Sequence, residues 1–276
     1  MDIMAPENTI ERKKVTSQAF DTSVSEGCTK FNFTAGQGNQ PKTDYCSNCA
    51  AHELALCSAL EGEELLEFGN DSTHKTLKPG QMLFSEYDEA NNFYTVVSGE
   101  VRLSRMLDDG RRQITGFKSI GDFVGLSAGK QYTVDAEAID EVVVCQFNVG
   151  RLNRSMKEHV EIQSRLMQMM QAEVISLQDH MLLLGRKTPV EKIANFLFER
   201  AQKKFKRNGE NEDTNSVVLT LPMSRTDIAD FLGLTIETVS RTITKLRKQG
   251  VISLISSQEV EIHDLSELHL LADGEG

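Results

Sequence analysis

Long apolar runs, a signal-peptide core and the common catalytic motifs are scarce or missing in this 276-residue sequence. No hydrophobic stretch approaches the roughly 20 residues that a membrane-spanning helix needs. The N-terminal MDIMAPENTIERKK has no apolar secretory core. Neither a P-loop nor an H-E-x-x-H motif occurs. We therefore expect a cytoplasmic protein with no membrane partner, and nothing in the sequence suggests an enzyme.

Cysteine is also scarce, but its placement is informative. The chain has five cysteines, and in a reducing cytoplasm thiols bind metals or stay buried rather than form disulfides. Cys46 and Cys49 form a C-x2-C pair, Cys57 follows after seven residues, and Cys145 lies in an apolar run at 141–147. Four thiolates suit an iron–sulfur cluster or a structural zinc site. Such a site would tie segment 46–57 to the domain behind it.

The residues alone leave alternatives for these cysteines. Cys145 also suits a buried position in a strand, where free cysteine is common. His52 is an alternative fourth ligand for zinc, although the second C-x2-C pair that zinc sites often use does not occur. Cys28 lies in a polar segment, eighteen residues before Cys46, and we expect it to take no part.

The first half of the chain changes from polar to β-like. Residues 1–44 have no periodicity and predict a disordered tail, and a short apolar helical stretch follows at 54–60. Short alternating runs from about 73 to 147 predict a jelly roll or barrel. Turn signals separate these runs at Lys78-Pro-Gly80, Ser98-Gly99, Asp108-Asp-Gly110 and Gly121-Asp122. Ser98-Gly99 is flanked as in a hairpin, and Asp109-Gly110 is a strong tight-turn pair.

A long helical pattern follows over about 159–184. Its apolar residues alternate in steps of three and four, as in a coiled-coil seam: Met167, Met170, Val174, Leu177, Met181 and Leu184. A second stripe, Ile162, Leu166 and Met169, would pack on the preceding domain. An amphipathic core helix is the alternative, but the regular alternation favours a homodimer helix. Methionines make such an interface adaptable.

The C-terminal part begins with a helix from Val190 to about Lys204, in which Ile193, Phe196 and Leu197 are expected to be buried. A surface loop at 208–215 and a short strand at 217–219 follow. Next come two helices separated by Gly233, as in a helix-turn-helix. Ser224 and Asp227 form a capping-box pattern, and Thr235 is expected to cap the second helix. Runs at 251–255 and 260–262 bracket a turn and predict the wing of a winged helix.

The second helix has one apolar stripe and one polar face. Val239, Ile243 and Leu246 are expected inside, whereas Glu237, Ser240, Arg241 and Lys245 are expected outside. Such side chains can bond base edges and phosphates of double-stranded DNA. The net charge of −11 argues against nucleic acid for the whole chain. Salt screens electrostatic fields beyond about 8 Å, however, so the local charge of the basic helix matters more for DNA binding than the net charge does.

With these motifs in their order, the sequence after residue 45 resembles the CRP/FNR family of transcription regulators, and the FNR branch in particular. The resemblance rests on Gln113-Ile-Thr-Gly-Phe117, Gly121-Asp-Phe-Val-Gly125, Leu182-Leu-Leu184 and Leu232-Gly-Leu-Thr-Ile-Glu-Thr-Val-Ser-Arg241. The C-x2-C-x7-C spacing resembles that of FnrN-like proteins. The second gap is longer than in the enterobacterial type, and the number of cysteine ligands is the same.

The resemblance implies an α+β fold: a cysteine segment with a β-roll (a cyclic-nucleotide-binding-like jelly roll), a long dimerisation helix and a C-terminal winged helix-turn-helix. The expected boundaries are 1–44, 45–158, 159–187 and 188–276. It also implies an oxygen-labile [4Fe–4S] cluster on Cys46, Cys49, Cys57 and Cys145. A homodimeric activator would read a palindromic FNR-box-like site through Glu237, Ser240 and Arg241, with Thr235 and Lys245 nearby, and act on RNA polymerase.

A cyclic-nucleotide receptor is the alternative within this resemblance, because the same β-roll serves that function. Such a pocket needs an arginine beside a serine or threonine to hold the cyclic phosphate. No arginine occurs between Arg112 and Arg151, so the usual charged donor is missing. A CRP-like regulator with a structural zinc site, or with another small-molecule effector in the β-roll, stays open.

Overall fold

The computed structural model describes residue 46 and residues 49–208 and 216–275. The chain divides into two compact units, 1–40 and 41–276, and every described residue falls in the second. The predicted tail at 1–44, Cys28 and nearly all of the predicted loop at 208–215 lie outside the described residues.

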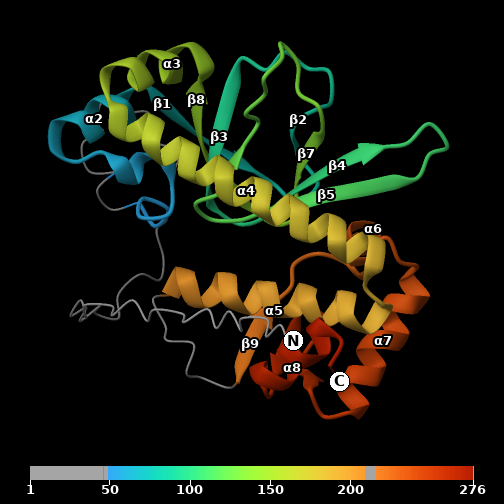
Figure 1. Ribbon diagram of the computed structural model, residues 1–276. Helices are drawn as coiled ribbons and strands as arrows, with labels where there is room; N and C mark the ends of the chain where they lie inside the picture. The colour runs from blue at the N-terminus through green and yellow to red at the C-terminus, as the bar shows by residue number, and fades with distance from the viewer. Residues whose placement is uncertain (1–45, 47–48, 209–215, 276) are drawn as a thin grey trace, which may run out of the picture. The chain divides into compact units, whose positions relative to one another are not determined.

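Two four-stranded antiparallel sheets face each other and form the β-roll (Figure 1). In sheet order, the first holds β1 (Ser72–Leu77), β8 (Val142–Asn148), β3 (Asn92–Ser98) and β6 (Phe123–Val124), and the second holds β2 (Met82–Phe84), β7 (Asp135–Ala138), β4 (Val101–Met106) and β5 (Arg112–Lys118). Alternating residues such as Val96, Val101 and Val144 are fully buried between them. The predicted jelly-roll texture from 73 to 147 is therefore confirmed.

One predicted hairpin is wrong and one is confirmed. The strands on either side of Ser98-Gly99 belong to different sheets, because β3 pairs with β8 and β6 whereas β4 pairs with β5 and β7. Gly99 has a φ of +77°, and a Cβ there would meet the carbonyl of Glu141. The turn residues fix only the local reversal, not the pairing partner. Asp109-Gly110 does close the β4–β5 hairpin, in which Met106 pairs with Arg112.

Short helices precede and follow the β-roll in the sequence. The predicted apolar stretch forms a 3₁₀ helix, η1 (Leu56–Ala59), and α2 (Gly62–Asn70) follows. Phe68 of α2 stacks on Phe147 of β8 with ring centroids 4.7 Å apart, so α2 closes one face of the roll. After β8, α3 (Val149–Glu158) leads into the long helix. The sequence analysis did not predict α2 or α3.

The long helix α4 (Val160–Arg186) confirms the helical pattern and lies across the β-roll (Figure 1). Its inner stripe is as expected: Ile162 is fully buried, and Leu166 and Met169 pack against the core formed by α2 and β8. Among the described residues, no helix is both long and apolar enough to cross a membrane.

The C-terminal part is a winged helix. Its elements are α5 (Pro189–Asn208), β9 (Val217–Thr220), α6 (Arg225–Leu232), α7 (Ile236–Lys248), β10 (Ile252–Leu254), β11 (Glu259–Ile262) and α8 (Leu265–Asp273). Ile193, Phe196 and Leu197 of α5 are buried as predicted. The two predicted wing strands pair, and β9 adds a third strand to their sheet. The terminal helix α8 was not predicted.

Candidate nucleic-acid interface and cysteine centre

The helix-turn-helix is built by the local signals that predicted it. Ser224 and Asp227 form a complete capping box at the start of α6, with hydrogen bonds of 3.1 and 2.9 Å between side chains and backbone amides. Gly233 ends α6 in the left-handed region at φ +61°. The Thr235 hydroxyl accepts from the amide of Thr238 at 3.2 Å and caps α7. The amides of Ser224, Asp227 and Thr238 therefore have partners close in sequence, so the starts of both helices are stabilised by local residues.

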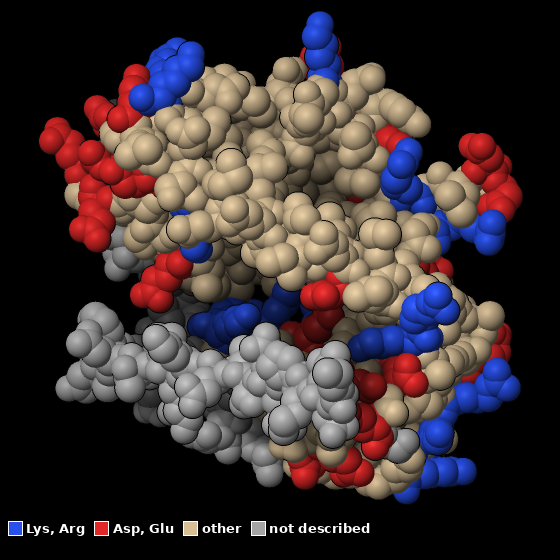
Figure 2. Space-filling view, viewed as in Figure 1, with Lys and Arg blue, Asp and Glu red and all other residues tan. Residues whose placement is uncertain are grey.

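The second helix, α7, separates an inner from an outer face as predicted. Val239, Ile243 and Leu246 are buried in the winged-helix core. The outer side chains of Thr235, Glu237, Ser240, Arg241 and Lys245 are exposed. Lys and Arg side chains gather around α7 (Figure 2). This face has donors and acceptors for base edges in its first turns and cations for phosphates in its last turn.

Glu237 is prepared to act as an acceptor. The backbone amides at the start of α7 and the Thr235 hydroxyl lower the pKa of its carboxyl group, and the nearby charge of Arg241 lowers it further. The side chain is thus ionised near neutral pH. A fixed carboxylate beside an arginine is a suitable pair for a major groove, because cytosine offers a donor and guanine offers two acceptors.

The structure brings together all four cysteines that the sequence singled out. Cys46, Cys57 and Cys145 adjoin one apolar core under α2 and η1. Burial raises the pKa of Cys57 to about 12, with further contributions from Cys49, Cys46 and Cys145. Burial likewise raises the pKa of Cys145 to about 12, and Cys46 and Cys49 act in the same direction. The thiols are therefore close enough to influence one another electrostatically.

Two glycines leave room for the cysteine segment, and one arginine donates a hydrogen bond to it. A Cβ on Gly69 of α2 would lie 2.6 Å from the Cys46 sulfur, so only glycine leaves room for this thiol. A Cβ on Gly121 would overlap Leu54 in the same way. From α4, the Arg165 guanidinium donates to the Leu54 carbonyl at 2.9 Å. The sequence pattern marked Gly121 only as a turn residue and did not indicate Gly69 or Arg165, since the partners of all three are distant in the chain.

The donor set fits an iron–sulfur or zinc centre in its chemistry, since four thiols and one histidine share this region. The Nε2 atom of His52 is buried and has no hydrogen-bond partner in the described part of the chain. Within those same residues, no three His, Cys, Asp or Glu side chains are arranged around a common point as a finished metal site. Cys46, Cys49, Cys57 and Cys145 are therefore candidate ligands because of their proximity and not because of a coordination geometry.

The interior of the β-roll contains aromatic side chains where a nucleotide receptor would need space. Phe84 stacks on Tyr132 with centroids 3.7 Å apart, and Tyr94 lies next to Phe84 at 5.9 Å. The Tyr132 hydroxyl donates to the Asn92 carbonyl at 2.6 Å. A Cβ on Gly125 would touch all three rings at 3.1–3.3 Å. This packing, like the missing arginine, argues against a cyclic-nucleotide pocket.

The outer face of α4 is apolar and exposed. The exposed fractions of its seam residues are 54% for Met167, 43% for Met170, 52% for Val174, 47% for Leu177 and 73% for Met181. Figure 2 shows a largely uncharged band along this helix. Leu184 differs, because it is half-buried and packs against the winged-helix core near Gly233. A helix face this apolar is suited to a partner helix.

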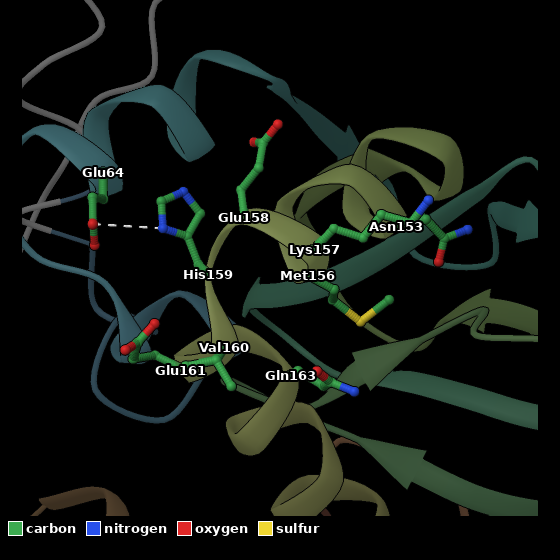
Figure 3. Close-up of a pocket in the computed structure, with 9 residues that line it drawn as sticks. All are labelled: Glu64, Asn153, Met156, Lys157, Glu158, His159, Val160, Glu161 and Gln163. Carbon is green, nitrogen blue, oxygen red and sulfur yellow. Dashed lines mark ion pairs between the residues drawn. The ribbon is translucent and has the colours of Figure 1, made fainter.

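Two further features carry no site. A hollow at the junction of α2, α3 and α4 is lined by Glu64, Glu158, His159 and Glu161, and His159 pairs with Glu64 at 3.5 Å (Figure 3). These groups do not form a metal-binding arrangement in the described residues.

The stretch 125–129 matches the G-x-S-x-G spacing of hydrolases. It lies between β6 and β7 rather than on a strand-to-helix turn, and the Ser127 hydroxyl donates to the Gln131 carbonyl.

Comparisons with known proteins agree with this arrangement. A model of the cyclic nucleotide-binding domain matches residues 74–159, and a model of the Crp-like helix-turn-helix domain matches residues 191–271. The nitrogen fixation regulation protein FixK of Bradyrhizobium diazoefficiens is 41% identical over 216 residues, which cover 78% of this chain and 89% of the relative. The transcriptional activator protein anr of Pseudomonas aeruginosa is 33% identical over 234 residues, with 84% and 93% covered.

Among solved structures, FixK2 from Bradyrhizobium japonicum has a TM-score of 0.66 and 35% identity to this chain. The match covers 72% of this chain and 96% of FixK2.

Proposed function

Because the chain belongs to the CRP/FNR family of DNA-binding transcription regulators, we propose that it is an oxygen-responsive member whose [4Fe–4S] cluster controls dimerisation. The observation that carries this proposal is the convergence of four cysteines from two distant segments beside α4. Cys46, Cys49, Cys57 and Cys145 would hold the cluster. When bound, it would supply an oxygen-labile cross-link between the cysteine segment and β8.

The cysteine segment reaches the dimer helix directly. Leu54 lies between the cysteine ligands in sequence, and its carbonyl accepts from Arg165 of α4. Arg165 is two residues before Met167, the first residue of the seam. A change in the position of the cysteine segment therefore acts on α4 where its apolar outer face begins.

The dimer would place two copies of α7 on a palindromic, FNR-box-like site in double-stranded DNA. Glu237, Ser240 and Arg241 would bond base edges, and Lys245 would contact phosphate. Thr235 would act mainly by fixing the start of α7, because its hydroxyl already caps the helix. The protein would act in the cytoplasm and contact RNA polymerase from its DNA site.

The cofactor is tested by metal and sulfide analysis of anaerobically purified protein. We expect iron and acid-labile sulfide in equal amounts, and loss of both when any one of Cys46, Cys49, Cys57 or Cys145 is replaced by serine. Cys28→Ser is the matched control and should keep the cluster. A Cys145→Ser protein with full iron and full anaerobic transcription would refute the ligand assignment.

A second candidate is a regulator of the same family without an iron–sulfur cluster. The identity of 41% to FixK favours a FixK-like role, and the unpartnered His52 nitrogen favours a structural zinc site. The same analysis separates the candidates. Zinc without sulfide supports the structural site, and neither metal supports a FixK-like regulator or one with a small-molecule effector.

A further inference from the structure

The β4–β5 hairpin is joined to the first helix of the helix-turn-helix by a cluster of charged groups. Arg112 donates to Asp227 at 2.7 Å and to Asp230 at 2.8 Å, both on α6. Arg102 of β4 donates to Asp227 at 2.5 Å and to Glu137 of β7 at 2.6 Å. The hairpin thus contributes two arginines to one α6 carboxylate.

Asp227 serves two structures with its two oxygen atoms. Its Oδ2 atom accepts from the Ser224 amide at 2.9 Å and completes the capping box. Its Oδ1 atom accepts from both arginines. Only 6% of the side chain is exposed, so these contacts are shielded from water and salt. Asp227 therefore both completes the capping box of α6 and binds α6 to the β-roll.

Apolar contacts extend this junction. Ile114 and Phe117 of β5 are buried in the same core as the winged-helix residues, and the Phe117 ring lies 5.2 Å from Phe231 of α6. The Gln113 amide donates to the Asp230 carbonyl at 2.7 Å. Figure 1 shows the β4–β5 hairpin beside α6, with α7 on the far side of α6.

We infer that Arg112 and Arg102, through Asp227, are positioning residues that set the orientation of the DNA-reading helix relative to the β-roll. The outer face of α7 stays exposed while this junction is intact, so the junction is compatible with DNA binding. In a dimer built on α4, fixed orientation of each winged helix fixes the distance between the two copies of α7. The inference rests on DNA binding by a dimer and not on the identity of the cofactor.

The distinguishing property is tolerance of half-site spacing. The two half-sites of a dimeric helix-turn-helix protein lie about one helical turn apart. One inserted base pair rotates a half-site by about 35°. A rigidly held winged helix cannot follow that rotation, whereas a loosely held one follows it in part.

The experiment measures binding of anaerobically purified Arg112→Gln protein to a series of palindromes with half-sites at optimal spacing and with one base pair added or removed. Arg112→Gln keeps the capping box intact. The matched control is Arg111→Gln, because Arg111 lies in the same hairpin and, within the described residues, forms its ion pair with the exposed Asp109 alone. Circular dichroism and sedimentation are recorded for each protein.

We expect the affinity ratio between optimal and altered spacing to fall roughly threefold or more in Arg112→Gln, a size typical of coupling between contacting residues. The ratio should not change in Arg111→Gln. Affinity for an isolated half-site should be equal in all three proteins. Arg112→Lys, which keeps a positive charge beside Asp227, should retain part of the spacing preference.

A folded, dimeric Arg112→Gln protein with the wild-type spacing preference would overturn the inference. So would a loss of affinity that is equal for the isolated half-site and for every spacing, because that pattern reports damage to α7 itself. If the wild-type protein showed no preference for paired half-sites, the dimer proposal would fail first, and the two failures are thus distinguishable.

Discussion

Gly69 and Gly121 are two residues at which the cysteine segment closely approaches the rest of the protein. Gly121 also lies in a turn with φ +86°, which favours glycine locally, whereas no turn near Gly69 calls for a glycine. Gly69 is inside α2, where glycine destabilises a helix by about 1 kcal/mol relative to alanine. Its presence there is explained by the Cys46 sulfur, which occupies the place of a Cβ.

Gly69→Ala should therefore weaken the cysteine centre without harming α2. The added methyl group would displace Cys46, so we expect iron and sulfide to be lost several times faster in air. The visible absorbance of the cluster measures this loss. Gly185→Ala is the control, since that helical glycine on α4 has no atom within 4 Å of a Cβ. Equal rates of loss in the two proteins would mean that Cys46 does not hold the centre.

Arg241 and Lys245 lie one turn apart on α7, and we expect different effects from their removal. Arg241→Ala should cost about 1–3 kcal/mol on the cognate site and relax discrimination at one base pair. Lys245→Ala should weaken binding to all sequences about equally and reduce the salt slope by about 1. Anisotropy titrations on sites with single base changes measure both. An equal loss on every sequence for Arg241→Ala would make it a phosphate contact.

At the scale of elements, sequence signals succeeded where a helix or turn is determined by its neighbours. The capping box at Ser224, the turn at Gly233 and the stripe of Val239, Ile243 and Leu246 are all local, and the structure confirms each. The Ser98-Gly99 hairpin failed because strand pairing depends on distant partners such as β8. Helix α2 was missed for a similar reason, since its Phe68 gains stability from packing on Phe147.

The same distinction applies to the candidate sites. Spacing was enough to single out Cys46, Cys49 and Cys57 and the outer face of α7, whereas Cys145 was singled out only with the help of the family resemblance. Spacing could not identify Arg165 or the Asp227 junction, because each contact joins residues more than a hundred positions apart.

The outer face of α4 is the element through which oxygen would control the assembly state. Seam residues such as Val174, Leu177 and Met181 are exposed in a single chain, by 52%, 47% and 73%. We expect dimers in anaerobic protein and monomers after exposure to air, because a few kcal/mol is enough to reverse such an equilibrium. Sedimentation before and after air exposure tests this. An identical mass in both states would refute the coupling, but not DNA binding.

At the scale of the whole molecule, the net charge of −11 and the basic α7 act at different distances. The acidic remainder repels DNA only within a Debye length, about 8 Å at physiological salt. The cations of Lys245, Arg247 and Lys248 in the last turn of α7 would lie within that length of a bound phosphate backbone. Specific binding is thus compatible with an acidic chain, and weak non-specific binding is expected.

The junction between the β-roll and the winged helix should also make the stability of the whole molecule depend on pH. Burial opposes ionisation of Asp227, but hydrogen bonds from Ser224 and the charges of Arg102 and Arg112 outweigh it, and the pKa of Asp227 is lowered from 3.8. A carboxyl group with a lowered pKa stabilises the folded state above its unfolded pKa. That contribution is lost as the pH falls below 3.8 through the folded value.

Asp227→Asn removes this contribution at every pH. We expect roughly 2–4 kcal/mol lower unfolding free energy at pH 7, because two partly buried arginines lose their shared anion. The difference from wild type should shrink as the pH falls below about 4, since protonation then weakens the same contacts in wild type. Glu100, whose pKa is raised by burial, titrates with the opposite sign in both proteins and cancels in the comparison. Urea unfolding from pH 7 to pH 3 measures the difference. A constant gap over this range would show that ionisation of Asp227 does not contribute to the stability of the folded protein.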